Sequence, residues 1–169
     1  RIMPTNPSFY EGGDRPVERV PWEDCQQFCR KAGLNLPTEA QWEYACRAGA
    51  PGAGPFAGTE RLEDVGWFDG IYGGKTHPAG QKQPNDFGLH DVHGNVCAWC
   101  EDRFDYSFYS TPEAAGPDPV CTWGSGLPVV RGGALFLNRP FPRCAERGRS
   151  LPDDRRSSIG FRVVASPPP

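Results

Sequence analysis

The chain has 169 residues and a formal net charge of −3, and 37% of its residues are hydrophobic. This length can build one domain with a hydrophobic core, and an acidic chain without a basic stripe is not expected to bind nucleic acid. No apolar run approaches the roughly 20 residues of a membrane-spanning helix, so we expect no membrane insertion.

Two helices are predicted in the first third of the chain. The first begins at Pro21, because proline favours the first helical position, and ends at Gly33, a typical C-cap residue. The second has Thr38 as its N-cap and Gln41 three residues later, the pair that forms a capping box. We expect this second helix to run to Gly49.

The remaining residues are predicted to form short strands and long ordered loops. Glycine and proline interrupt residues 49–84 and 105–128, where only a short strand within VGWFDGIYGG is expected. Further strands are predicted at the end of PNDFGLHDVHGNVCAW, in VVRGGA with a bulge at its glycines, and over residues 159–164. The fold class is therefore α+β. We expect one domain over residues 1–165 and a Pro-rich tail over residues 166–169.

The chain has seven cysteines, an odd number, so at least one thiol cannot pair within it. Cys25 and Cys29 lie four residues apart on the first predicted helix, which is typical of a buried apolar face. Cys97 and Cys100 form the only CxxC motif, without the second pair that such a zinc site needs. We expect mostly buried thiols; one or two disulfides, or redox or metal chemistry, are the alternatives.

Four motifs occur in the order found in a known domain family: LPTEAQWEYACRAG, PNDFGLHDVHGNVCAWCED, RGGA and GFRVV. With them the chain resembles the formylglycine-generating-enzyme-like (sulfatase-modifying factor) domain, a variant of the C-type lectin fold. The resemblance implies that fold, with two helices, short strands and long ordered loops. It also implies that the family's upstream strand and helix are missing from this chain.

The resemblance gives a direct test for enzymatic activity. Enzymes of this family hold two cysteines between the Gly-Gly pair and a later Arg-Cys-Ala; these bind copper and use oxygen to oxidise a substrate cysteine. Here the segment from Ala134 to Pro142 contains no cysteine, and Cys144 matches a third family cysteine with a packing role. Without a thiolate there, we expect no copper and no catalysis. An oxygen-dependent cysteine-oxidising enzyme with an atypical site is the alternative.

A family calcium site falls by position on Asp91, Gly94 and Val96. Ala98 replaces the glutamate of that site, and calcium usually needs several oxygen ligands that include carboxylates. We therefore expect no cofactor, with these residues as the calcium candidates.

The resemblance also extends to iron-dependent sulfoxide synthases, which need an upstream domain with three histidines. This chain has only His77, His90 and His93. We interpret His90 and His93 as hydrogen-bonding residues of a turn.

The scaffold further resembles the variable proteins of diversity-generating retroelements, whose C-terminal surface is randomised to bind different ligands. Departures from the family pattern cluster in GNVCAW and after RGGA, while RGG, RCA and IGFRVV are intact. This resemblance implies a non-catalytic ligand-binding domain. The candidate ligand-binding residues are Cys97, Ala98, Arg103, Phe104, Leu135, Phe136, Leu137, Asn138, Arg139, Phe141, Ser150, Leu151, Arg156, Ser157 and Ser158.

The segment after RGGA has the composition of a contact surface. Leu135, Phe136, Leu137 and Phe141 would form an apolar patch if they are exposed together, and Arg139 would add a planar hydrogen-bonding group. The alternative is that the two leucines point into the core as strand residues.

The expected partner is a protein or another macromolecule. Seven arginines between residues 139 and 162 would favour an acidic ligand, unless they pair internally with acidic loops. A regulatory or accessory domain of a multidomain bacterial protein is a second hypothesis, compatible with the first. The oligomeric state and localisation stay open; the lack of a signal peptide leans toward the cytoplasm.

Overall fold

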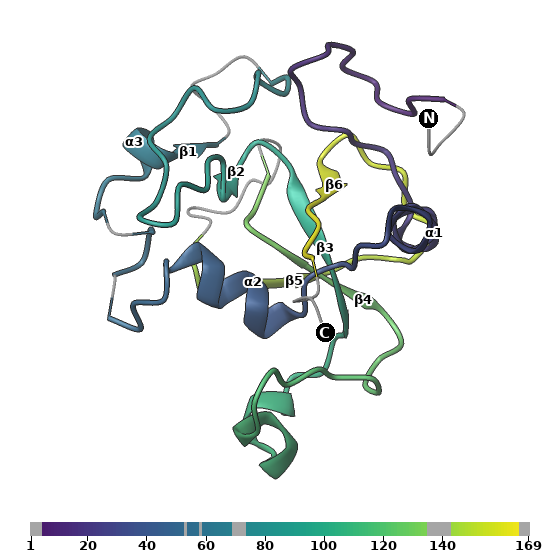
Figure 1. The fold of residues 1–169 in the computed structure, drawn as a ribbon, viewed down its shortest axis with the longest axis vertical. Helices are drawn as coiled ribbons and strands as arrows, with labels where there is room; N and C mark the ends of the chain where they lie inside the picture. The colour runs from purple at the N-terminus through teal and green to yellow at the C-terminus, as the bar shows by residue number, and fades with distance from the viewer. Residues whose placement is uncertain (1–4, 53, 58, 69–73, 135–142, 166–169) are drawn as a thin grey trace.

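The computed structural model describes residues 5–52, 54–57, 59–68, 74–134 and 143–165 (Figure 1). Short helices and strands separated by long loops make the fold α+β, as predicted. The elements are α1 (Trp22–Ala32), α2 (Glu39–Cys46), α3 (Leu62–Val65), β1 (Gly66–Trp67), β2 (His93–Gly94), β3 (Cys97–Arg103), the 3-10 helices η1 (Phe108–Ser110) and η2 (Pro112–Ala115), β4 (Pro128–Arg131), β5 (Arg147–Arg149) and β6 (Ile159–Phe161).

A four-stranded mixed sheet in the order β5-β4-β3-β6 organises the molecule. Strand β4 pairs antiparallel with both β3 and β5, whereas β6 pairs parallel with β3. Strands β1 and β2 form a separate parallel pair. Because α2 packs against β3 and β4, the two middle strands carry the contact between helix and sheet.

The capping box predicted for α2 is confirmed. The Thr38 hydroxyl accepts a hydrogen bond from the Gln41 backbone N–H at 3.1 Å, and the Gln41 side chain accepts one from the Thr38 backbone N–H at 3.1 Å. The helix ends at Cys46 rather than at Gly49, because Arg47 has already left helical geometry, with ψ near 0°.

Helix α1 starts one residue later than predicted. Pro21 is its N-cap, with an extended ψ of 155°, and Trp22 is the first helical residue. Gly33 is the C-cap, with a left-handed φ of 69°, as predicted. Cys25 and Cys29 lie on the buried face of the helix, which confirms their interpretation as part of an apolar stripe.

Three segments differ from their predictions. Residues 147–149, where no strand was predicted, form β5, because Gly148 pairs with Val130 of β4. The last strand stops at Phe161, since Val164 leaves the sheet and pairs with Asn35 instead. Helix α3 forms in a region where only loops and a short strand were expected.

Strand β3 contributes side chains to the two larger of the three hydrophobic clusters in the described part of the chain. Side chains alternate along a strand, so Cys97 and Trp99 pack with residues of α1, whereas Ala98 and Cys100 pack with Trp42 of α2. All seven cysteines are buried with free thiols, as the sequence favours.

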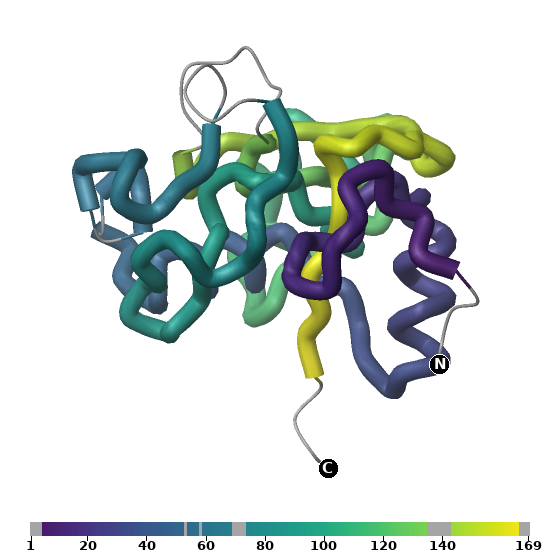
Figure 2. The backbone as a smooth tube through the Cα atoms, turned by 90° about the horizontal axis from the view of Figure 1, so that it is seen from above, coloured from purple at the N-terminus to yellow at the C-terminus, as the bar shows by residue number. Residues whose placement is uncertain are grey.

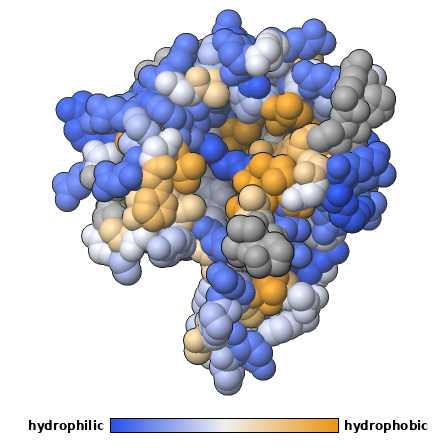
Figure 3. Space-filling model, viewed as in Figure 1, coloured by the Kyte–Doolittle hydropathy of each residue, from blue (hydrophilic) through white to orange (hydrophobic). Residues whose placement is uncertain are grey.

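The chain after residue 143 crosses the molecule from one side to the other. In Figure 2 the segment from residue 143 to residue 158 runs along one side, while the last described residues leave on the opposite side. The face seen in Figure 3 is largely hydrophilic, with hydrophobic residues around a central hollow. Among the described helices, none combines the length and apolar character required to cross a bilayer.

Candidate functional site

A cavity with a volume of about 470 Å³ adjoins the four-stranded sheet. Every strand of that sheet contributes to its wall: Cys97 from β3, Val130 from β4, residues 147–149 from β5 and Ile159 from β6. The volume lies within the roughly 300–1,000 Å³ that is usual for small-molecule pockets. Ala134, which also lines the cavity, is the last described residue before the segment 135–142.

Two glycines shape this cavity. A Cβ atom at Gly148 would lie 2.9 Å from the Cγ2 atom of Val130, so a side chain at this position would press into the wall. Gly132 follows β4 with a left-handed φ of 89°, a conformation that residues with a side chain rarely adopt. Together they allow the chain to pass closely around the cavity and turn away from the sheet.

One wall consists of aromatic rings and arginines. The Arg149 guanidinium lies 4.7 Å from the centre of the Phe104 ring and 5.1 Å from that of Tyr106, and it donates to the Tyr106 hydroxyl at 2.8 Å. Tyr106 is 80% exposed. An exposed aromatic ring beside a planar guanidinium combines two of the side-chain types most common at interface anchors.

Another part of the lining is polar. Its Ser150 hydroxyl donates to the Asp154 carboxylate, which also forms an ion pair with Arg156 at 3.3 Å. Ser150 is buried, whereas Arg156 is exposed. This wall therefore offers a ligand the Arg156 side chain, while the serine hydroxyl is engaged within the protein.

The structure brings a third of the predicted ligand-binding residues together at the cavity. These are Cys97, Phe104, Ser150, Arg156 and Ser158.

The other described candidates do not line it. Ala98 packs in the core, and Arg103 stacks on Trp22 with its guanidinium 4.1 Å from the ring centre. Leu151 is exposed and Ser157 is half-buried. The remaining six candidates, Leu135, Phe136, Leu137, Asn138, Arg139 and Phe141, lie outside the described residues.

Sequence reasoning missed several cavity residues, above all Tyr106, Arg147 and Arg149. The segment RGR was counted only as part of a basic region. Three residues carry too little periodicity to identify a strand, so its pairing with β4 could not be read from the sequence.

The calcium candidates hold internal contacts. Both carboxylate oxygens of Asp91 accept hydrogen bonds, from the Trp67 indole N–H at 3.0 Å and from the Gly80 backbone N–H at 2.8 Å. Gly94 lies in β2 with a left-handed φ of 91°. Val96 lines a second cavity together with Asp91 and Gly94.

The arginines of the basic region are largely paired within the protein. Arg162 donates to the backbone carbonyls of His90 and Asp91. Three others form ion pairs, which supports internal pairing over a free basic patch. These pairs are Arg147–Glu39 at 2.7 Å, Arg155–Asp24 at 3.6 Å and Arg156–Asp154 at 3.3 Å.

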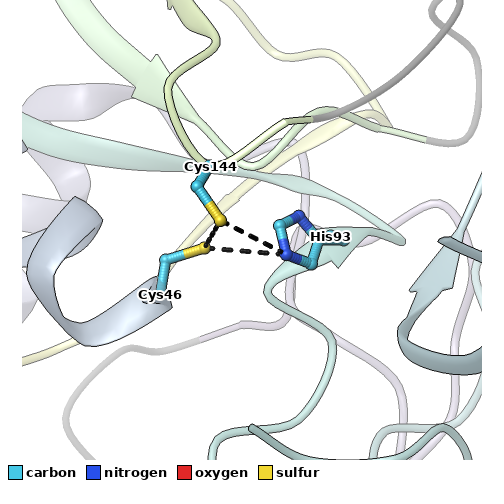
Figure 4. Close-up of side chains that lie close together, drawn as sticks. All are labelled: Cys46, His93 and Cys144. Carbon is cyan, nitrogen blue, oxygen red and sulfur yellow. Dashed lines mark hydrogen bonds between the residues drawn. The ribbon is translucent and has the colours of Figure 1, made fainter. Parts of the chain in front are cut away.

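A second group of reactive side chains lies in the core and was not predicted. The ligand-type atoms of Cys46, His93 and Cys144 all lie within 4.8 Å of one another, and all three side chains are buried (Figure 4). His93 belongs to β2 and not to the predicted turn. The sequence offers one hint of this group, a histidine that lies between two cysteines of separate motifs. Spacing alone does not show that the three side chains come into contact.

The two thiols of this group differ in acidity. Hydrogen bonds from the Cys46 thiol, from His93 and from the Ala57 backbone N–H lower the pKa of Cys144. The pKa of Cys46 is raised, because its thiol donates to Cys144 and is desolvated. The cavity thiol of Cys97 is different again: burial raises its pKa to about 12.

Known proteins share this architecture. The formylglycine-generating enzyme of Streptomyces coelicolor is 33% identical over 167 residues, which cover 89% of this chain and 52% of that protein. A serine/threonine-protein kinase, pkn1 of Chlamydia pneumoniae, is 32% identical over 88% of this chain but only 24% of its own length. Treponema denticola variable protein 1 superimposes with a TM-score of 0.83 and 27% identity, covering 98% of this chain and 79% of that chain.

The chain spans about half the length of the curated formylglycine-generating enzymes that it matches. The likeness to these proteins confirms the C-type lectin-like fold of the formylglycine-generating-enzyme type. The model of the sulfatase-modifying factor enzyme 1-like domain matches residues 3–167, and the chain belongs to this family.

Proposed function

We propose that this chain is a non-catalytic ligand-binding domain of the variable-protein type, with its binding surface around the cavity beside β4 and β5. The observation that carries the proposal is the segment between Ala134 and Arg143, which contains no cysteine. The similarity to Treponema denticola variable protein 1 supports it. The wall formed by Phe104, Tyr106 and Arg149 supplies the contact chemistry.

The cavity favours a protein ligand with an exposed acidic or aromatic side chain. Arg149 can pair with a carboxylate while its face stacks on Tyr106, and such a planar donor suits bidentate contacts. Because Tyr106 is exposed, it can be buried by a partner without rearrangement of the core.

A binding experiment tests this surface. The purified chain would be screened against a defined panel of purified bacterial surface proteins, and variants would be measured by surface plasmon resonance against any binder. We expect Tyr106→Ala and Arg149→Ala each to weaken binding roughly tenfold or more. The matched controls, Tyr44→Ala and Arg61→Ala, alter exposed residues outside the cavity and should bind as the parent chain does. Equal losses in controls and cavity variants would contradict the proposed surface.

A second experiment tests the absence of catalysis. The chain would be loaded with copper and incubated with oxygen and a cysteine-containing peptide, with the Streptomyces coelicolor enzyme as the positive control. We expect no aldehyde product by mass spectrometry. More aldehyde product than copper alone forms would show an enzyme with an atypical site and would overturn the proposal of a non-catalytic domain.

The variable-protein type has its own test. The coding region for residues 97–158 would be sequenced deeply in a population of the source organism. We expect changes concentrated at adenine-templated codons of the candidate residues, together with a nearby template copy and a reverse transcriptase gene. A uniform, invariant region without these genes would exclude diversification, while leaving the binding experiment valid.

A second candidate function is that of an accessory domain in a longer bacterial protein. It is favoured by the kinase of Chlamydia pneumoniae, of which a related domain forms only 24%. The two functions are compatible. The complete gene sequence decides this point, because it shows whether a catalytic domain precedes or follows the region described here.

A further inference from the structure

The buried group of Cys46, His93 and Cys144 has the geometry of a metal site. The two sulfur atoms are 3.5 Å apart, and each lies 3.8 Å from the Nε2 atom of His93 (Figure 4). Atoms at these separations share a centre roughly 2.1 Å from each, close to the roughly 2.0–2.3 Å bonds that zinc forms with nitrogen and sulfur. A single ion can therefore reach all three atoms without movement of the backbone.

The three residues come from separate parts of the chain, and each is held in place by its backbone. Cys46 ends α2, where the Asn85 amide donates to its carbonyl oxygen at 3.0 Å. Cys144 donates its backbone N–H to the Pro55 carbonyl at 2.8 Å. His93 begins β2 and pairs with β1. A site assembled by the fold in this way is preorganised for its ion.

Further contacts around the group resemble the outer shell of a thiolate–metal site. The Ala57 backbone N–H donates to the Cys144 sulfur at 3.3 Å, and the Arg131 guanidinium donates to the Cys144 carbonyl at 2.8 Å. The Phe56 ring stands edge-on to the His93 imidazole, 5.8 Å between centres. Hydrogen bonds to ligand atoms and an apolar surround orient metal ligands.

We propose that Cys46, His93 and Cys144 bind one thiophilic divalent ion, zinc, which ties α2 to β2 and to the segment before β5. Two thiolates and a neutral imidazole carry a charge of −2, so a divalent ion makes the buried site neutral. Monovalent copper would leave a buried negative charge. Since zinc takes four ligands, a water molecule completes its coordination. This site is independent of the proposed binding function and of the family's catalytic copper pair.

The first measurement uses the unaltered chain. It would be purified in zinc-containing, chelator-free buffer with a phosphine reductant, and its mass determined under native conditions. We expect about one zinc per chain and a lower melting temperature after chelation, because an ion bound only by the folded state stabilises it. Cobalt substitution should give sulfur-to-cobalt absorption, and its visible bands should report four ligands. A chain without stoichiometric zinc or cobalt, or one that carries copper instead, would overturn the proposal.

Variants locate the ion. Cys46→Ser and His93→Gln should lose bound zinc, with at least a tenfold drop in affinity, whereas Cys25→Ser should keep it. Cys25 is the matched control, because it is an equally buried thiol in the other core cluster. If the ligand variants fail to fold, peptide mapping of the unaltered chain under non-reducing conditions decides the matter. A Cys46–Cys144 disulfide in place of metal, or equal zinc loss in Cys25→Ser, would refute the site.

Discussion

The arginines of the neighbouring strands β4 and β5 are held in different ways. Arg131 is 1% exposed and lies 3.6 Å from the Glu39 carboxylate, and Arg147 forms two hydrogen bonds of 2.7 Å to the same carboxylate. Arg147 and Arg149 both lie over the Phe104 ring, at 4.8 and 4.7 Å, but Arg149 donates to the hydroxyl of exposed Tyr106 and not to a buried carboxylate. Arg131 and Arg147, the inner arginines, hold a buried carboxylate, whereas Arg149, the outer arginine, is exposed where the proposed function places a ligand.

This difference separates arginines whose removal should destabilise the fold from one that can be replaced at low cost. Where two arginines share a buried carboxylate, removing any one of the three groups lowers the stability of the fold, because a buried charge is then left without a full partner. A guanidinium stacked at the surface can be exchanged at low cost.

The largest expected effect is that of Arg131→Ala. It removes a partner of buried Glu39 and the donors to the carbonyls of Glu146 and Cys144. We expect a loss of about 3–5 kcal/mol in the free energy of unfolding, measured by urea denaturation. Arg61→Ala, which breaks an exposed ion pair with Asp64, should cost less than about 1 kcal/mol. A loss for Arg131→Ala as small as that of the control would show that the buried pair is not part of the scaffold.

The Cys97 thiol in the cavity wall should react slowly in the folded protein. Burial raises the pKa of Cys97 from 9.0 to about 12. Since only the thiolate is nucleophilic, we expect Cys97 to react with iodoacetamide at pH 8 roughly a thousandfold more slowly than the unfolded chain. Peptide mass spectrometry before and after denaturation measures this. Rapid labelling in the folded state would show that small reagents reach Cys97 and that the pKa of its thiol is lower than its burial indicates.

The local elements could be predicted from the sequence because their signals are local. Thr38 and Gln41 form the capping box of α2, and Gly33 ends α1, each as its position indicates. Strand β5 escaped prediction because three residues carry too little periodicity, and pairing with β4 is what defines it. The fold class therefore followed from motifs, whereas the short strands required tertiary contacts.

The candidate site was only partly predictable for the same reason. Cys97 could be selected because GNVCAW departs from the family pattern, and Phe104 directly follows the same strand. Tyr106 and Arg149 meet across 43 residues of sequence, and nothing in either segment indicates the other. The group of Cys46, His93 and Cys144 was even harder to predict, since its two cysteines are 98 residues apart in the sequence.

A moderate effect is expected at the start of α2, the helix that carries Glu39. Thr38→Ala removes the acceptor for the Gln41 backbone N–H and should cost about 1 kcal/mol of unfolding free energy. Thr122→Ala, at an exposed loop position, is the matched control and should lie within about 0.5 kcal/mol of the parent chain. Since α2 presents Glu39 to both inner arginines, equal effects in the two variants would mean that the helix start does not help to position that carboxylate.

The smallest expected effect on stability is that of Arg149→Ala. The variant loses cation–π contacts at an exposed position, which are worth about 0.5–1 kcal/mol, and leaves no buried charge behind. Urea denaturation of this variant beside Arg131→Ala measures the contrast between the outer and inner arginines directly. A cost for Arg149→Ala equal to that of Arg131→Ala would place Arg149 in the scaffold. Arg149 would then be needed for a stable fold. Any loss of binding in this variant would in that case reflect a damaged fold instead of a lost contact with the ligand.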